Sequence, residues 1–288
     1  MRRRDFLLGA LAMTGAPTIT RAGDSGVVSL DYGLASTMLA VGSVPRAIAA
    51  LRNWPEWVVE PAMPPGVVDI GTTSEINLEV LTSLRPSLIL STPFLAALDD
   101  KLARIAPVET FTVYAENGDA LDRSYAETLR LGAMIGRRQE AEAFLAHADA
   151  RFGQLRERAR SLSAPPVAVI NFIDQRHARI YGGPGLYGGA MRRIGLENAW
   201  KGEASYWGFQ TIGLEQLAEL DEETHLVVVS PLFPPDVLTR LSESPLWTSL
   251  PFVRRRISVV PGVLMFGMVQ EALRFATLMV DVLETAAR

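Results

Sequence analysis

The sequence predicts an α/β protein of two lobes, each a parallel sheet flanked by helices, joined by one long rigid helix with a ligand cleft between the lobes. Three observations carry this prediction. Short apolar segments alternate with helical segments early in the chain, and the alternation restarts at Val167. A long helical run, Arg138–Ser161, separates the two series. A phrase that begins Ile-x-Leu-Glu occurs once in each half, from Ile76 and from Ile212. Alternating strands and helices are typical of parallel sheets covered by helices on both faces.

The first lobe begins with the apolar segment VVSLD, which reads as a strand, and the helix after it should end at Gly42. The same alternation then continues through the first copy of the repeated phrase. Strands are predicted at 27–31, 67–71, 87–91 and 110–114, and helices at 33–42, 77–84 and 96–105.

The segment between the lobes has the pattern of an amphipathic helix. Phe144, Leu145, Ala148, Phe152 and Leu155 fall on one helical face, with Arg and Glu opposite. An uninterrupted helix here would be roughly 35 Å long. The pair Pro165-Pro166 should then stop it. Because a flexible linker would be rich in Gly and Ser, this connection is predicted to be a rod.

The second lobe repeats the alternation after the prolines. Strands are predicted at 167–173, 225–230 and 257–261, and helices at 186–194, 237–241 and 269–285, with the second copy of the phrase from Ile212. The expected division of the chain is 1–22 export signal, 23–137 N-terminal lobe, 138–164 interlobe helix and 165–288 C-terminal lobe. Domain interfaces commonly bind small ligands, so a cleft between the lobes is the expected site.

The first 22 residues have the order of an export signal: arginines, a short apolar stretch and small residues, with cleavage expected after Ala22. Arg3-Arg4-Asp5-Phe6-Leu7 resembles the twin-arginine signal, and a general secretory signal is the alternative. Removal of four Arg and one Asp changes the net charge from −4 to −7. Such an acidic protein is a poor candidate for nucleic-acid binding. The expected location is the periplasm.

The composition excludes several kinds of chemistry. The chain has no Cys, which rules out disulfides, thiolate metal sites, a Cys nucleophile and a lipid-modified N-terminal Cys, so no membrane anchor is expected. His147, His177 and His225 are dispersed, which argues against a zinc site. No G-x-S-x-G elbow or P-loop is present. The Gly-rich segment Gly182–Gly189 is predicted to be a loop entering a helix rather than a phosphate cradle. We therefore expect neither an enzyme nor a resident metal or cofactor.

Aromatic residues in loops are the most distinctive candidates for ligand contact. Trp54 and Trp57 lie in a Pro-rich segment, and Tyr206-Trp207 lie in EASYWGFQ. Core packing explains loop aromatics less well than helical ones. Trp57 and Trp207 are therefore the stronger candidates for ligand contact and Trp54 the weaker. Aromatic walls suit a large, partly apolar ligand in a wide groove.

Several motifs, in one order along nearly the whole chain, are similar to those of a known family. They are WVVEP, VVDIG, EINLEVL, RPSLIL, LARIAP, IDQRH, ENAWKGEASYWG and SPLWTSLPFVR. The chain resembles periplasmic iron–siderophore binding proteins of the ferrichrome (iron–hydroxamate) family, within the long-backbone-helix class of ABC-transporter substrate-binding proteins. The resemblance implies two Rossmann-like lobes, little closure on binding, a monomer, and delivery of a ferric siderophore to an inner-membrane ABC permease.

The resemblance also offers a reason for the repeated phrase. In the family, each lobe presents an exposed carboxylate to one of two permease subunits, and the matching positions here are Glu79 and Glu215. Two similar docking surfaces on a dimeric permease would require two similar phrases. The alternative is that each Glu is simply favoured in the first turn of a helix by the helix dipole.

The chain departs from the family at its expected polar clamp. Thr72-Thr73 stand where an Arg is expected to hold the hydroxamate oxygens, and Leu264 replaces an expected aromatic. A hydroxamate or citrate–hydroxamate siderophore other than ferrichrome is therefore expected, with haem, a corrinoid or another metal chelate as the alternative cargo and an exported enzyme as a third hypothesis. The residues predicted to contact the ligand are Trp57, Trp207, Tyr32, Thr73, Phe94, Tyr206, Phe266 and Arg176, with Arg52 as a weaker basic candidate.

Overall fold

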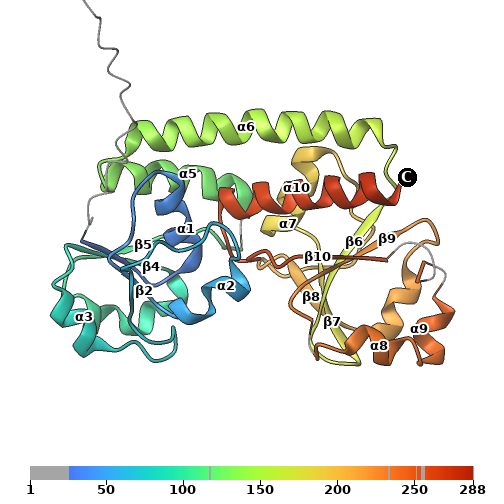
Figure 1. Cartoon of the computed structure of the whole chain (residues 1–288), viewed down its shortest axis with the longest axis horizontal. Coiled ribbons are helices and arrows are strands. Elements are labelled where there is room, and N and C mark those ends of the chain that lie inside the picture. The colour runs from blue at the N-terminus through green and yellow to red at the C-terminus, as the bar shows by residue number, and fades with distance from the viewer. Residues whose placement is uncertain (1–25, 117, 233, 251, 254–256, 288) are drawn as a thin grey trace, which may run out of the picture.

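The computed structural model describes residues 26–287, apart from 117, 233, 251 and 254–256, and contains two separate five-stranded sheets (Figure 1). The first has the order β3-β2-β1-β4-β5 and is parallel throughout. Its strands are β1 (Val27–Ser29), β2 (Ala47–Ile48), β3 (Val68–Asp69), β4 (Leu88–Ser91) and β5 (Val108–Thr110).

The second sheet has the order β10-β9-β6-β7-β8 and is mixed. Its strands are β6 (Val167–Phe172), β7 (His177–Tyr181), β8 (Phe209–Gly213), β9 (His225–Val229) and β10 (Ile257–Val260). Strands β10, β9 and β6 are parallel, whereas β7 is antiparallel to both β6 and β8. Asp174 shapes the short β6–β7 turn, where its Oδ1 accepts hydrogen bonds from the N–H groups of Arg176 and His177. A turn this short joins only antiparallel strands, because a parallel connection needs a crossover of a dozen or more residues.

Helices cover both sheets. Around the first sheet lie α1 (Tyr32–Ala40), α2 (Trp54–Trp57), α3 (Leu78–Leu84), α4 (Asp99–Leu102), α5 (Ala120–Met134) and the 3₁₀ helices η1 (Leu51–Asn53) and η2 (Pro93–Leu98). Around the second lie α7 (Leu186–Ile194), η3 (Leu214–Glu219), α8 (Val237–Leu241), α9 (Pro245–Ser249) and α10 (Val269–Ala286). None of the helices in the described part of the chain is long and apolar enough to cross a membrane.

The connecting helix α6 spans Arg138–Ser161, the predicted range, and lies along one side of the molecule (Figure 1). Its buried face consists of Ala141, Leu145, Ala148, Phe152, Leu155 and Ala159. This face packs against α5, α10 and α7, so helices that follow either sheet share one layer. Arg158 ties α6 to the C-terminal helix through ion pairs with Asp281 and Glu284, at 2.7 and 2.8 Å.

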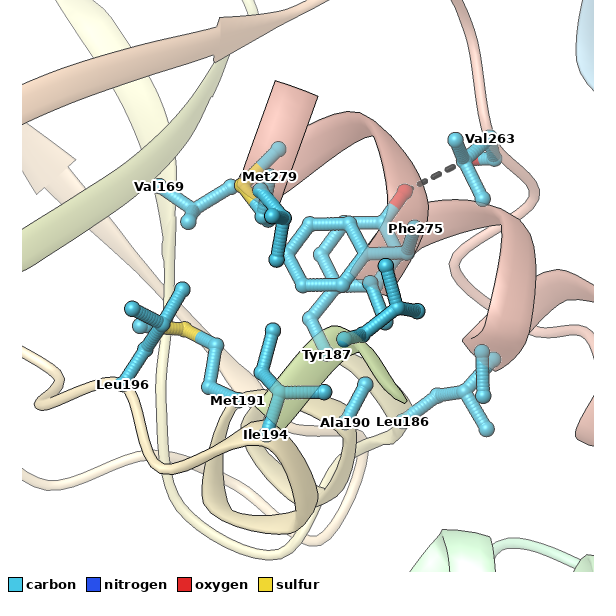
Figure 2. Close-up of a cluster of buried hydrophobic side chains, with 14 of the residues drawn as sticks. Val169, Leu186, Tyr187, Ala190, Met191, Ile194, Leu196, Val263, Phe275 and Met279 are labelled. Atoms are coloured by element: carbon cyan, nitrogen blue, oxygen red, sulfur yellow. Dashed lines mark hydrogen bonds between the residues drawn. The ribbon is translucent and has the colours of Figure 1, made fainter. Parts of the chain in front are cut away.

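A hydrophobic cluster between α7 and α10 supports the segment that enters the cleft (Figure 2). The rings of Tyr187 and Phe275 are stacked, with centroids 4.1 Å apart and an interplanar angle of 4°. The Tyr187 hydroxyl donates a hydrogen bond to the Val263 carbonyl at 2.5 Å. Buried polar groups need such partners, and this bond fixes the chain at the start of segment 263–266.

The two copies of the repeated phrase occupy equivalent places in the two halves. Each starts a short helix, α3 or η3, that leads into the strand paired with the first strand of its sheet, β4 with β1 and β9 with β6. Glu79 and Glu215 each take the second helical position, after the N-caps Asn77 and Gly213. The repetition therefore reflects one topological unit used twice.

The two-lobed α/β fold is confirmed, with local differences from the prediction. The strand expected at 110–114 lies at Val108–Thr110. Strands β2, β7 and β8 and helices α2, α5 and α9 were not predicted, and the second copy of the phrase forms a 3₁₀ helix. The second sheet is mixed rather than parallel as predicted, because β7 is antiparallel to its neighbours. The expected export signal and its cleavage site lie outside the described residues. The expected limits of the lobes, 23–137 and 165–288, stay predictions.

Candidate functional site: a cleft between the lobes

Two adjoining cavities, of about 550 and 310 Å³, form a cleft between the two lobes. Leu30, Asp31, Thr73 and Phe266 line both, so the cavities are continuous along these residues. Each volume falls within the range of small-molecule sites. The cleft is wide enough for an elongated or bulky ligand.

The carboxyl ends of parallel strands deliver most of the lining. Asp31 follows β1, the segment Thr92–Leu95 follows β4, Ser230 follows β9, and the segment Val263–Phe266 comes after β10. In open α/β sheets, ligands bind outside the carboxyl ends of the strands. Here two such edges face each other, and each lobe supplies one wall.

An aromatic wall runs along the larger cavity and crosses from one lobe to the other. The Tyr114 ring stacks on Trp207 at 5.8 Å, and Phe266 meets both rings edge-on at 5.7 and 5.4 Å. Tyr206 lies 4.6 Å from Trp207, and Phe209 lies 6.3 Å from Phe266. Contacts among the rings hold their faces in place before a ligand arrives, which lowers the entropy cost of binding.

A close backbone crossing positions Trp207. A Cβ atom on Gly185 would lie 2.4 Å from the Gly208 Cα, and Gly208 itself has φ +84°, so neither position accepts a side chain. The Gly208 carbonyl also accepts a hydrogen bond from the Gly182 N–H at 3.0 Å. Gly185 is the N-cap of α7. The Gly-rich segment is thus the predicted loop into a helix, and its glycines allow the Trp207 loop to pack against it.

Tyr114 also joins the lobes through its hydroxyl. That group donates to the carbonyl of Met265 or Gly267, which lie at 2.9 and 3.0 Å. Burial, with the nearby charges of Asp31 and Glu271, holds the pKa of Tyr114 well above its usual value. The group therefore remains a hydrogen-bond donor, and it anchors the segment that carries Phe266.

Arg179 is the cationic side chain that the structure places in the cleft, where it lines the smaller cavity. Its guanidinium lies 5.0 Å from the Phe209 ring centroid, a cation–π distance. Arg179 lies in β7, which was missed because HARIY is short and contains a charged residue at its centre. Its alternation was the available signal: Ala178 and Ile180 face one core cluster, and Arg179 and Tyr181 face the other way.

Asp31 is the anionic side chain of the cleft. It caps α1, where Oδ1 accepts a hydrogen bond from the Leu34 N–H at 2.9 Å. Burial raises the pKa of Asp31 to about 6, and backbone hydrogen bonds oppose that shift. The sequence offered no reason to assign Asp31 to the site beyond its position at the end of a strand.

The structure brings together seven of the eight predicted contact residues. Phe94, Tyr206 and Trp207 line the larger cavity, Tyr32 and Trp57 the smaller, and Thr73 and Phe266 both. Arg176 lies elsewhere. It lines a separate pocket of about 410 Å³ at the far end of the second sheet, together with Glu215. It occupies the β6–β7 turn, whereas Arg179 is carried along β7 toward the cleft.

Two weaker candidates are also placed outside the cleft. Trp54 is buried, and its Nε1–H donates to the Pro61 carbonyl at 2.8 Å, so it belongs to the core. Arg52 is almost fully exposed and lies 3.6 Å from an Asp69 carboxylate oxygen. Neither residue lines either of the two cavities.

Glu79 and Glu215 are both exposed and line neither cavity of the cleft. Helix α3, which carries Glu79, lies at the end of the molecule away from α6, as do α8 and α9 of the other lobe (Figure 1). Glu215 lines a pocket with residues of α8 and α9, which places it at the same end. Within the described residues, no three His, Cys, Asp or Glu side chains are placed to hold a metal ion.

Comparisons with known proteins agree with this geometry. The sequence model described as periplasmic binding protein matches residues 27–257. The iron(3+)-hydroxamate-binding protein FhuD of Escherichia coli (strain K12) is 29% identical over 253 residues, which cover 86% of this chain and 83% of that protein. The crystal structure of the Fe3+–Desferal-bound siderophore binding protein FhuD from Vibrio cholerae has a TM-score of 0.85 at 26% identity and covers 91% of this chain and 98% of that one.

A more distant structure shares the fold. The triscatecholate siderophore binding protein FeuA of Bacillus subtilis, complexed with ferri-bacillibactin, has a TM-score of 0.72 at 17% identity and covers 92% of this chain and 94% of its own. The match to the sequence model spans both lobes and most of the chain. The protein therefore belongs to the periplasmic binding protein family, whose members are substrate-binding proteins rather than enzymes and act outside the cytoplasm.

Proposed function

We propose that this protein is the substrate-binding component of an ABC importer, which captures a ferric hydroxamate siderophore in the periplasm and delivers it to an inner-membrane permease. The observation that carries the proposal is the combination, in one cleft, of an aromatic wall with the guanidinium of Arg179. The FhuD proteins of E. coli and V. cholerae, named for hydroxamate and siderophore binding, support the ligand class.

The chemistry of a ferric hydroxamate fits the two parts of this cleft. Such a complex has an apolar backbone and a face of iron-bound oxygens that carry partial negative charge. The rings around Trp207 and Phe266 offer a broad apolar contact. The Arg179 guanidinium offers a planar fork of donors for two neighbouring oxygens. The iron belongs to the cargo, and the protein needs no resident cofactor to hold it.

Arg179 also supplies a cation that the family resemblance places on the other lobe. At that place stands Thr73, a neutral, exposed side chain that lines both cavities. A hydroxyl is a weaker partner for an anionic oxygen than a guanidinium. Because the cation lies on the opposite wall, we expect a ligand orientation, and a siderophore preference, different from those of a ferrichrome binder.

The proposed delivery step uses residues outside the cleft. Glu79 and Glu215 occupy equivalent helix positions, are exposed, and have no ion-pair partner among the described residues. A monomeric binding protein with one such carboxylate on each lobe would present one to each subunit of a dimeric permease. Basic pockets on the permease are the expected complement.

The test is a tryptophan-fluorescence titration of the mature protein with ferrioxamine B, ferrichrome, a ferric citrate–hydroxamate, haem and cobalamin. We expect quenching by at least one ferric hydroxamate or citrate–hydroxamate complex, weaker binding of ferrichrome, and little response to the iron-free siderophores. Saturable binding of haem or cobalamin alone would replace the siderophore with another cargo. No response to any ferric siderophore would overturn the proposal.

A pair of matched variants sharpens the test. Arg179→Gln should weaken ferric hydroxamate binding roughly tenfold to a hundredfold, because a charge-assisted hydrogen bond is lost. Arg176→Gln removes an arginine only three residues away that lies outside the cleft, and it should leave the affinity unchanged. Weaker binding by Arg176→Gln, with Arg179→Gln unaffected, would place the ligand in the pocket beside Glu215 instead of the cleft.

A further inference from the structure

Asp31 places a carboxylate where the two cavities of the cleft meet. The residue lines both of them and is partly exposed there. Both its backbone and its side chain are held: the Ser29 hydroxyl donates to the Asp31 carbonyl at 2.7 Å, and Asp31 Oδ1 accepts from the Leu34 N–H at 2.9 Å. The residue is therefore held in a fixed position beside the ligand space.

No cation compensates this carboxylate in the described part of the chain. Asp31 forms no ion pair with any described residue, and its pKa is shifted by burial and backbone hydrogen bonds rather than by a positive neighbour. The titratable groups around it are Tyr32, Tyr114 and Glu271, which are neutral or anionic. Arg179, the other charged side chain lining the cleft, belongs to the wall formed by the other lobe.

A bulky ligand that fills the cleft must remove water from Asp31. Burying an unpaired carboxylate is costly, and the cost falls only if the group takes up a proton or meets a cation. A ligand with a positive group at this point avoids the penalty, whereas a ligand with an uncharged or anionic group there does not. The carboxylate thus discriminates between ligands by charge.

Ferric trihydroxamates differ in charge only through their appended groups, because three hydroxamate anions neutralise Fe3+. Arg179 is suited to the iron-bound oxygens common to all of them. Asp31, on the opposite wall, is suited to an appended cation. Arg179 and Asp31 would therefore bind different parts of one ligand.

We propose that Asp31 is a specificity-determining residue that selects ferric hydroxamates bearing a protonated amine, by accepting the ammonium group where the two cavities meet. This inference rests on the proposed function and names the ligand subclass. It favours a cationic cargo over the citrate–hydroxamate class, which carries carboxylates.

The experiment compares two ligands that differ at one group. Ferrioxamine B is a linear ferric trihydroxamate that ends in a primary amine, and acetylation of that amine removes its charge. Calorimetric titration of the wild-type protein should show tighter binding of ferrioxamine B, by roughly tenfold or more. In Asp31→Asn the preference for ferrioxamine B over its acetylated form should vanish, mainly because ferrioxamine B binds more weakly.

Two controls separate charge recognition from damage to the fold. Asn caps a helix as well as Asp does, so Asp31→Asn should keep α1. Because burial raises the pKa of Asp31, the neutral variant should melt no lower than the wild type at pH 7. Asp69→Asn removes a carboxylate in β3 that lines neither cavity and should leave the ligand preference intact. A preference that persists in Asp31→Asn, or equal binding of both complexes by the wild type, would overturn the assignment.

The pH dependence gives a second readout with a defined sign. Because the pKa of free Asp31 is about 6, affinity for ferrioxamine B should fall as the pH drops through 6, where the carboxylate becomes neutral. Affinity for the acetylated complex should not fall. Burial also raises the pKa of Glu271 to about 7, but Glu271 lines neither cavity. An equal pH dependence in Asp31→Asn would therefore overturn the role of Asp31.

The outcomes also distinguish this inference from the proposed function. Binding of both complexes without discrimination would leave the siderophore function in place and overturn only the role of Asp31. Failure of both complexes to bind would overturn the hydroxamate assignment and the inference together.

Discussion

Two tryptophans three residues apart show how closely site and core can adjoin. Trp54 is 1% exposed and its indole N–H is paired with the Pro61 carbonyl, whereas Trp57, on the same short helix, lines the cleft. Position in a Pro-rich segment did not distinguish them, because the burial of each ring depends on which parts of the fold pack against it and not on the local sequence. Trp207 lies in the cleft for a clearer reason, since two glycines bring its loop against the start of α7.

We expect opposite effects from Trp207→Ala and Trp54→Ala. Loss of Trp207 should weaken ligand binding without unfolding the protein, because the ring is part of the cleft wall. Loss of Trp54 should lower stability by about 3–5 kcal/mol through the cavity it leaves. Calorimetric titration and thermal melts measure both effects. If Trp207→Ala instead loses its cooperative melt, that tryptophan belongs to the core.

At the scale of elements, the start of α10 holds a fully buried carboxyl group. Glu271 is 0% exposed, and its Oε2 accepts a hydrogen bond from the Met268 N–H at 2.8 Å. Burial raises the pKa of Glu271 from 4.5 to about 7, helped by the charge of Asp31. In the unfolded chain the group ionises at its usual pKa. The free energy of unfolding therefore falls as the pH rises through this window.

The variant Glu271→Gln tests how much the ionised Glu271 lowers the free energy of unfolding. Gln can keep the cap on Met268 but carries no charge. The variant should be more stable than the wild type at pH 8, by up to about 3 kcal/mol from the shift in pKa, and nearly equal at pH 4. Chemical denaturation at the two pH values measures the difference. A Gln variant less stable than the wild type at pH 8 would show that the carboxylate has a stabilising partner.

Helices α3 and η3 carry the repeated Glu. If these residues dock on the permease, their removal should impair transport but not ligand binding or stability. The double variant Glu79→Ala, Glu215→Ala should keep its ligand affinity and its melt, because surface substitutions usually change stability by no more than about 0.5 kcal/mol. Siderophore-dependent growth should fall, since removal of a carboxylate leaves its basic partner unpaired in the complex. Each single variant should be less affected than the double.

The matched control lies on α6. Glu142 and Glu157 are exposed carboxylates in local ion pairs on that helix, away from the proposed docking end. Their double Ala variant should grow normally. Normal growth of the Glu79, Glu215 variant on the siderophore would contradict the docking role. Loss of ligand binding would instead place those residues in the ligand site.

At the scale of the whole molecule, many contacts bridge the halves. Helices α5, α6, α7 and α10 form a common layer, and Arg192 pairs with Asp119 across the junction. The Ala120 N–H donates to the Pro184 carbonyl at 2.9 Å, close to the bonds of the Tyr114 hydroxyl. A hinge motion would have to break several of these contacts together.

We therefore predict little closure on ligand binding. The radius of gyration from small-angle X-ray scattering should be the same, within error, for the free and the ferric-siderophore-loaded protein. The same measurement on Tyr114→Phe shows whether that hydroxyl restrains the lobes. A smaller radius for the loaded wild-type protein would indicate domain closure and contradict a rigid α6.

The sequence alone determined the features that depend on local pattern. The bounds of α6, the first strand of each sheet and the repeated phrase follow from apolar spacing and from proline, which act within a few residues. The antiparallel pair β7 and β8, the choice of Arg179 over Arg176, and the entry of Asp31 and Tyr114 into the cleft were decided by the tertiary structure. The physical reason is that a cleft is made by strand ends and loops far apart in the chain. Which side chains face it depends on sheet order and register, and a local pattern does not specify either of these.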